Sequence, residues 1–83
     1  MGGFAMKKVK ILVNSIEKVK DFVNTISKHD AEFDMVSGRY VIDAKSIMGI
    51  FSLDLSEPID LVIHAEGDKA DKILADIKNY IVE

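Results

Sequence analysis

Few residues of this 83-residue chain have the types and spacing that catalysis or metal binding requires. It contains two histidines, His29 and His64, and no cysteine. Neither histidine belongs to an H-x-x-x-H or H-E-x-x-H pattern, and no glycine-rich phosphate loop is present. We interpret His29 as a solvated helix end and His64 as a polar-face strand residue, because lone histidines are most often structural. The sequence therefore predicts no catalytic residue, no metal ion, no cofactor and no enzyme activity.

The acidic residues also fail to form a recognisable site. The acidic residues from Asp30 to Asp34 alternate with apolar residues, as on the solvated face of a strand. They lack the glycine and the spacing of an EF-hand calcium-binding loop. In the whole chain, 11 Lys and Arg stand against 14 Asp and Glu, a net charge of −3. This charge offers no attraction to a phosphate backbone, so we expect no nucleic-acid partner.

The most informative segment is the short run from Lys45 to Leu53. Ser46 can cap a short helix, although Gly49 weakens the helix prediction. The segment also has five large apolar residues: Ile47, Met48, Ile50, Phe51 and Leu53. On so short a helix they point in most directions, although Ile47, Ile50 and Phe51 can share one side. Some should form an exposed patch, in which methionine suits an adaptable protein contact. The alternative is a plain cap followed by core residues, with Ile47, Met48 and Phe51 all buried.

The elements that position these residues follow from hydrophobic periodicity. Alternation with a period of two predicts strands over residues 8–14, 33–36, 40–43 and 59–66, with Gly38 in the turn of a hairpin. Helical spacing predicts a helix capped by Asn14 or Ser15, a short helix after Ser46, and a final helix capped by Asp68. The expected apolar stripes are Ile16, Val19, Phe22, Val23 and Ile26, and then Ala70, Ile73, Leu74, Ile77 and Ile81. This β-α-β-β-α-β-α order predicts an α+β fold with helices on one face of a mostly antiparallel sheet.

Length and composition favour a surface function. A domain of this size buries only about 60% of its unfolded surface, which leaves little room for an enclosed active site. We expect residues 1–5 to be a disordered leader or tag and residues 6–83 to form a single domain. The apolar runs are far shorter than the roughly 20 residues of a membrane helix, and no signal peptide is visible. Together with the absence of cysteine, this favours a cytoplasmic protein without a membrane partner.

The run from Asp43 to Leu53 resembles the regulatory-serine segment of HPr, the small phosphocarrier of the bacterial sugar phosphotransferase system. In that family lysine, serine, isoleucine, methionine and glycine are followed by a second serine and a leucine, as in Lys45–Gly49, Ser52 and Leu53 here. Residues 10–15, 23–31 and 61–67 also resemble family segments. The resemblance implies an HPr-like open-faced β-sandwich, with a four-stranded antiparallel sheet and three helices on one face.

The HPr family has two functional sites, and this chain resembles it at one of them. The family's phosphoacceptor histidine precedes the first helix in a glycine-isoleucine-histidine-alanine-arginine-proline loop, where this chain has Ile16 to Lys20 without histidine, arginine or proline. The serine matching Ser46 is phosphorylated by an ATP-dependent HPr kinase, and the residues matching Ile47, Met48 and Phe51 bind partner proteins. We add Leu53 to this predicted surface. In keeping the serine without the histidine, the chain resembles Crh, the catabolite-repression variant of the family.

These observations predict a regulatory protein-interaction module of the phosphotransferase system rather than a histidine phosphocarrier. Its partners would be an HPr kinase or a transcriptional regulator, bound through the segment from Ser46 to Leu53. Two alternatives stay open. One is a phosphocarrier with another acceptor, such as His29 or His64. The other is a binding protein with the HPr fold and a partner unrelated to sugar transport.

Overall fold

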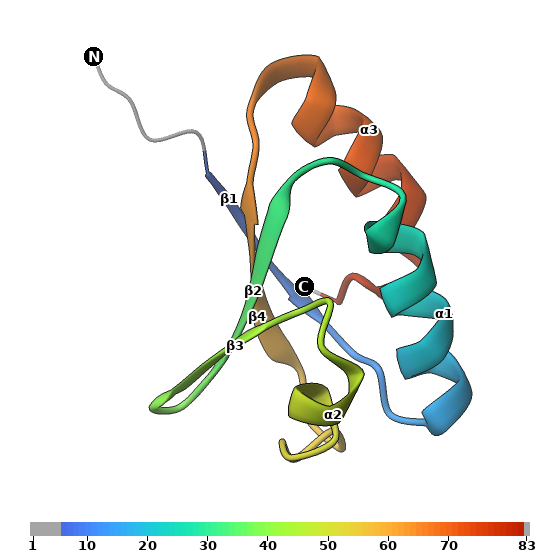
Figure 1. Cartoon of the computed structure of the whole chain (residues 1–83), viewed down its shortest axis with the longest axis vertical. Helices are drawn as coiled ribbons and strands as arrows, with labels where there is room; N and C mark the ends of the chain where they lie inside the picture. The colour runs from blue at the N-terminus through green and yellow to red at the C-terminus, as the bar shows by residue number, and fades with distance from the viewer. Residues whose placement is uncertain (1–5, 83) are drawn as a thin grey trace.

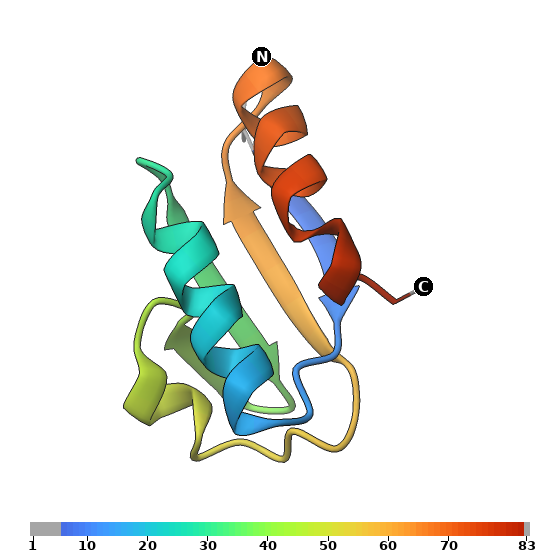
Figure 2. The same cartoon turned by 90° about the vertical axis from the view of Figure 1, so that its right-hand side faces the viewer.

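The computed structural model describes residues 6–82, so the predicted leader at residues 1–5 lies outside the described residues. Four strands form one sheet, and helices cover one of its faces (Figures 1 and 2). The elements are β1 (Lys7–Ile11), α1 (Ile16–Ser27), β2 (Glu32–Ser37), β3 (Tyr40–Asp43), α2 (Ile47–Ile50), β4 (Ile59–His64), α3 (Gly67–Ile77) and the 3-10 turn η1 (Lys78–Tyr80). The predicted α+β class and order of helices and strands are confirmed, and η1 is an addition.

The sheet has the order β1-β4-β2-β3, and all neighbouring strands are antiparallel. Leu61 in β4 lies opposite Val9 on one side and Met35 on the other, so the last strand in the sequence lies inside the sheet. Alternate residues face the helices and pack in the core: Val9, Ile11, Phe33, Met35, Ile42, Ile59, Leu61 and Ile63. Residues between these positions lie on the opposite side, which no helix within residues 6–82 covers (Figure 1). We call that side the open face.

Helices α1 and α3 lie side by side over the sheet (Figure 2). Their buried side chains follow the predicted apolar stripes: Val19, Phe22, Val23 and Ile26 in α1, and Ala70, Ile73 and Ile77 in α3. Phe22 meets Tyr80 of η1 edge to face, with ring centroids 5.5 Å apart. Partial burial, with a smaller contribution from the charge of Asp21, raises the pKa of the Tyr80 phenol. This aromatic pair attaches the end of the chain to α1.

The N-terminal end of α1 corrects one prediction about the core. Ser15 is the N-cap, as one of the two predicted candidates, and its hydroxyl accepts a hydrogen bond from the Lys18 N–H at 3.1 Å. Ile16, however, is 62% exposed instead of joining the apolar stripe. It is the first residue of α1, one turn before the first side chain of the helix that reaches the core.

The C-terminal third of the chain also differs from the prediction. Asp68 does not cap α3, because the chain already reverses at Gly67, which has a φ of +62°, and Glu66 is the N-cap without a side-chain hydrogen bond. Asp68 instead lies in the first turn, where its charge still suits the helix dipole. Ile81 is not helical but forms an antiparallel bridge with Ile11, because the chain end pairs alongside β1.

Two predicted strands are shorter than expected. The first ends at Ile11 instead of residue 14, and the last ends at His64 instead of residue 66. Val13 and Ala65 are nevertheless buried, so the alternation of buried and exposed side chains continues beyond the last residue of each strand. Within residues 6–82, no helix has both the length and the hydropathy to cross a membrane.

Candidate functional site

The turn between β3 and α2 presents Ser46 at the start of the short helix. The Asp43 carboxylate accepts a hydrogen bond from the Lys45 N–H, and the Asp43 carbonyl accepts one from the Ser46 N–H, both at 2.9 Å. Ser46 is extended, with a φ of −94° and a ψ of 100°, and its Oγ accepts a hydrogen bond from the Gly49 N–H at 3.3 Å. The predicted role of Ser46 as the helix cap is therefore confirmed, and its side chain is exposed.

Gly49 allows this turn to close tightly. A Cβ atom at Gly49 would lie 3.2 Å from the Ser46 Oγ and 3.5 Å from the Ile42 Cδ1 atom. The missing side chain thus lets the helix wrap around the Ser46 hydroxyl and approach β3. From the sequence alone, Gly49 only weakens the helix prediction. Its closeness to β3 cannot be predicted there, because it depends on the tertiary fold.

The apolar side chains of this segment divide between the core and the surface. Ile50 is fully buried, and Ile47 and Leu53 are half-buried against the core. Met48 is 81% exposed and Phe51 is 39% exposed. The prediction of an exposed apolar patch is therefore confirmed, and the alternative with Ile47, Met48 and Phe51 all buried is wrong.

The short helix ends earlier than the predicted run. Helix α2 stops at Ile50, and Phe51 is its C-cap. Phe51 consequently does not share the buried position of Ile50, because a single turn carries only part of its apolar residues onto the core. Helix α2 packs against α1 and β3, at the end of the sheet where α1 begins (Figures 1 and 2).

Side-chain hydrogen bonds order the segment that follows α2. The Ser52 hydroxyl donates to the Gly49 carbonyl at 2.5 Å. The Asp54 carboxylate accepts from the Ser56 hydroxyl at 2.6 Å and from the Ser56 N–H at 3.1 Å. These two bonds hold the pKa of Asp54 below its usual value. Helix α2 thus lies between two hydrogen-bonded turns.

The two histidines belong to other parts of the molecule. The His29 side chain is partly buried, with its Nε2 atom 2.8 Å from the Asp76 carboxylate of α3, and the His29 carbonyl accepts a hydrogen bond from the Lys45 Nζ at 3.1 Å. His29 thus lies just beyond the end of α1, as predicted, but it is less solvated than expected because its imidazole contacts α3. His64 is exposed at the end of β4, with its Nε2 2.8 Å from the Asp34 carboxylate. That agrees with the predicted polar-face strand residue.

The region that precedes α1 contains no imidazole. The sequence has no histidine before His29, and Asn14 and Ser15 lead directly into Ile16. Lys18 Nζ donates a hydrogen bond to the Asn14 side-chain carbonyl at 3.2 Å, which holds this cation against the helix start.

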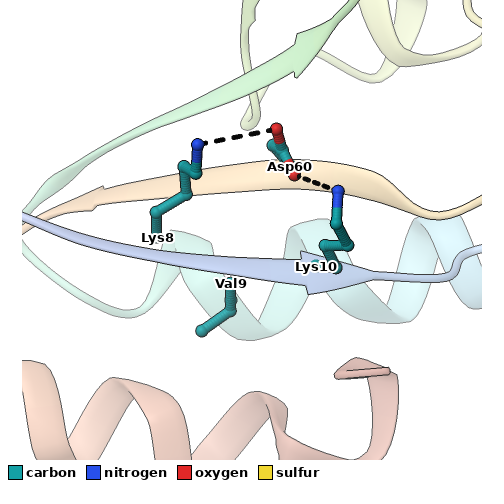
Figure 3. A pocket seen from close by; sticks show the side chains of 4 residues that line it. All are labelled: Lys8, Val9, Lys10 and Asp60. Atoms are coloured by element: carbon teal, nitrogen blue, oxygen red, sulfur yellow. Dashed lines mark hydrogen bonds and ion pairs between the residues drawn. The ribbon is translucent and has the colours of Figure 1, made fainter. Parts of the chain in front are cut away.

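Two surface hollows are lined by residues outside α2. One, of about 300 Å³, is lined by Lys8, Val9, Lys10 and Asp60 (Figure 3). Val9 points away from the three charged side chains, which gather on the other side of the strand pair. The second, of about 380 Å³, is lined by Ala31, Glu32, Phe33, Asp34, Asp43 and Lys45. Among residues 6–82, no three His, Asp or Glu side chains are arranged to hold a metal ion.

Asp60 is the charged centre of the first hollow. The Lys10 Nζ lies 2.8 Å from one of its carboxylate oxygens, and the Lys8 Nζ lies 3.9 Å from the other (Figure 3). The hydrogen bond from Lys10 lowers the pKa of Asp60, and the charges of Lys10 and Lys8 act in the same direction.

Comparisons with known proteins agree with this architecture. The family model described as "PTS HPr component phosphorylation site" matches residues 17–83, and so begins within the first turn of α1. The crystal structure of HPr-C-His from Thermoanaerobacter tengcongensis is similar to this chain, with a TM-score of 0.65 and 26% sequence identity. The match covers 89% of this chain and 86% of that chain.

The family match thus spans α1 to α3, including Ser46 and the whole of α2, and the structural match extends over nearly the entire domain. HPr proteins are phosphocarriers that interact with other proteins of the phosphotransferase system. The chain belongs to the HPr family and is a phosphocarrier-like protein of the phosphotransferase system.

Proposed function

We propose that this protein is a regulatory, protein-binding member of the phosphotransferase system that acts in the cytoplasm and is controlled by phosphorylation of Ser46. Its partner surface consists of Ser46, Ile47, Met48, Phe51 and Leu53, which we call the α2 surface. The observation that carries the proposal is that Met48 is 81% exposed on a helix anchored by the fully buried Ile50. The proposed partner is an HPr kinase or a transcriptional regulator, and the protein itself catalyses no reaction.

The α2 surface has the composition of an adaptable contact. Burial of an apolar side chain of this size stabilises a complex by about 1.5–3 kcal/mol. Methionine is flexible and polarisable, so Met48 can fit partners of different shape. Met48 and Phe51 supply most of the exposed apolar area of this surface. Ile47 and Leu53 are half-buried against the core and add a smaller area beside them.

Phosphorylation of Ser46 would change this surface through charge. The Ser46 Oγ forms a bond to the γ-phosphorus of ATP, the bond from that phosphorus to ADP breaks, and the hydroxyl proton passes to a base of the kinase. The product carries about −1.5 to −2 charges beside Met48. Partners that bury this region in an apolar contact would bind more weakly, whereas partners with arginine at the contact would bind more tightly.

The surroundings of the two histidines argue against a phosphorelay through either of them. Each has its Nε2 atom 2.8 Å from a carboxylate, Asp76 for His29 and Asp34 for His64. A phosphoryl group on that nitrogen would lie against a charge of the same sign. Both also lie far along the chain from the start of α1, where helix N–H groups favour an anion.

Intact-mass measurement after two separate incubations tests the proposed modification. One incubation contains ATP and an HPr kinase, and the other contains phosphoenolpyruvate and enzyme I. We expect one ATP-dependent phosphate that is absent in Ser46→Ala and retained in the matched variant Ser52→Ala. Because Ser46→Ala removes a helix cap, its circular dichroism spectrum must show that the fold is retained.

The second incubation tests the alternative function. We expect no phosphate from phosphoenolpyruvate. An acid-labile phosphate that disappears in a His29→Ala, His64→Ala double variant would instead establish a phosphocarrier with a different acceptor. The absence of modification in both incubations would contradict regulation at Ser46 and favour a partner outside sugar transport.

The contribution of Met48 is tested by the kinetics of the same kinase. Met48→Ala should raise the KM for this protein about tenfold, as expected when a contact of about 1.4 kcal/mol is lost. Met6→Ala is the matched control, because Met6 is also well exposed, at 49%, but lies beside β1. Equal KM values for the two variants would contradict the proposed surface.

A further inference from the structure

The open face of the sheet carries positive charge toward one edge and negative charge toward the other. Its cations, Lys8 and Lys10, lie on the edge strand β1 beside Asp60 of β4, and the other carboxylates lie on β2 and on the opposite edge strand, β3. Its ten residues are Lys8, Lys10, Glu32, Asp34, Val36, Val41, Asp43, Asp60, Val62 and His64. No helix of the described part of the chain covers them (Figure 1).

Strand register arranges these side chains in rows across the sheet. Lys8, Val62, Asp34 and Asp43 form one row, and Lys10, Asp60, Val36 and Val41 form the next. Glu32 and His64 face each other in a third row. Val36 lies directly opposite Val41, and Val62 is the diagonal neighbour of Val36, so the valines make a continuous apolar strip. Val41 is 63% exposed, and Val36 and Val62 are half-buried.

We propose that the open face binds a second copy of this chain as a two-fold symmetric dimer, with the symmetry axis parallel to the strands. Charge complementarity between the two edges of the face favours this axis. A rotation about such an axis exchanges the two edges of the sheet, so β1 of one copy lies over β3 of the other. A rotation about an axis across the strands would place β1 over β1, with lysine against lysine, and is therefore disfavoured.

The proposed rotation keeps each residue in its row and forms one charged contact twice by symmetry, with Lys8 of each copy facing Asp43 of the other. Glu32 of each copy faces His64 of the other. Sheets packed face to face lie about 10 Å apart, a gap that a lysine and an aspartate side chain can span together. The Lys8 side chain is 68% exposed, and its Nζ lies 3.9 Å from the Asp60 carboxylate, whereas the Lys10 Nζ lies 2.8 Å from it, so Lys8 is the less tightly held of the two cations.

Val36 and Val62 lie on the two middle strands of the same interface. The rotation places Val36 of one copy over Asp60 of the other and diagonal to its Val62, so these valines meet beside the symmetry axis. This contact leaves the α2 surface accessible, because α2 packs against α1 on the helical side of the molecule. The proposal therefore does not rest on the proposed function of α2, and either can fail without the other.

Sedimentation equilibrium of the full chain, with charge-reversal variants, tests the dimer. Lys8→Glu places Glu against Asp43 in both contacts, and Asp43→Lys places Lys against Lys8. Each variant alone should dimerise at least tenfold more weakly than the wild type. When the two are mixed, every contact again joins opposite charges, so a heterodimer should form with affinity near that of the wild type. Val41→Lys should also abolish dimerisation.

The matched control is Lys7→Glu, which makes the same charge change on the same strand but on the other face of the sheet. It should dimerise like the wild type. Three results would overturn the proposal: a wild-type protein that stays monomeric at millimolar concentration, an equal effect of Lys7→Glu and Lys8→Glu, or no recovery in the mixture. A dimer broken by Met48→Asp but not by Val41→Lys would place the interface on α2 and also reject the open face. Circular dichroism melting confirms that each variant folds, and Val41→Lys tests the same face without altering the turn at Asp43.

Discussion

At the scale of single residues, Gly38 is required by the backbone of the β2–β3 hairpin. Ser37 pairs with Tyr40, which leaves Gly38 and Arg39 as a two-residue turn. Gly38 has a φ of +60°, whereas no non-glycine residue among those described has a positive φ. Arg39 therefore has a negative φ, as in a type II′ turn, whose first position strongly favours glycine.

Gly38→Ala should destabilise the protein by about 1–2 kcal/mol. A Cβ atom at this position would meet nothing within 4 Å, so the cost comes from the backbone conformation and not from a clash. Urea unfolding measures the effect, with Arg39→Ala as the neighbouring control that should change stability little. Equal stability of Gly38→Ala and the wild type would show that the turn relaxes to another type.

Asp60 is expected to make stability depend on pH. Because the Lys10 hydrogen bond lowers the pKa of Asp60 in the folded state, the unfolded chain takes up a proton first as the pH falls. The stabilisation is therefore complete above the unfolded pKa of about 3.9 and is lost as the pH falls through the lower, folded value.

Asp60→Asn should therefore lower the free energy of unfolding by about 0.5 kcal/mol near neutral pH, the usual size for an exposed pair, and have almost no effect at about pH 2. Urea unfolding at several pH values provides the measurement. Glu57→Gln serves as the control, because Glu57 is exposed and forms no ion pair with the described residues. A difference between Asp60→Asn and the wild type that stayed constant with pH would rule out the ion pair as its source.

At the scale of elements, one residue of α2 anchors the helix in the core and another is proposed to contact partners. Ile50 is fully buried, and Met48, two residues earlier in the same helix, is 81% exposed. Ile50→Ala should cost about 2–4 kcal/mol, because it removes core contacts and leaves a cavity. Met48→Ala should change stability by less than about 0.5 kcal/mol.

Thermal unfolding followed by circular dichroism compares these two variants. Kinase recognition, measured on folded protein, should show the opposite order. Met48→Ala should impair recognition more than Ile50→Ala does. If Met48→Ala unfolded the protein as readily as Ile50→Ala, the side chain would be part of the core and not of a binding surface.

The helix ends show how far capping rules based on neighbouring residues can predict the structure. Ser15 and Ser46 were predicted as caps because a hydroxyl can satisfy N–H groups three residues away, which is a property of neighbouring residues. Asp68 satisfied the same local rule but is not the cap, because the reversal at Gly67 moved the start of α3. Local rules therefore located each helix but not always its first residue.

At the scale of the whole molecule, the proposed dimer makes the melting temperature depend on protein concentration. Association through the open face stabilises only the folded state, so Tm should rise by several degrees between about 10 μM and about 1 mM. Lys8→Glu should remove this dependence, and Lys7→Glu should retain it. Scanning calorimetry at both concentrations distinguishes the two variants, and a concentration-independent Tm for the wild type would contradict the dimer.

The sequence by itself determined the fold class, the order of elements, the cap at Ser46 and the exposure of part of the segment from Ile47 to Phe51. These follow from periodicity and capping, which act over a few residues. A single turn of helix has more large apolar side chains than one buried side can take, so exposure at Met48 was predictable from the sequence alone.

Only the tertiary structure decided which distant residues meet. His29 pairs with Asp76 across 47 positions, and Lys10 with Asp60 across 50. The role of Gly49 beside Ile42, and the division of charge over the open face, likewise depend on strand order and register. The physical reason is that alternation predicts which face a side chain takes, whereas its neighbours across the sheet are set by how the whole chain packs around its core.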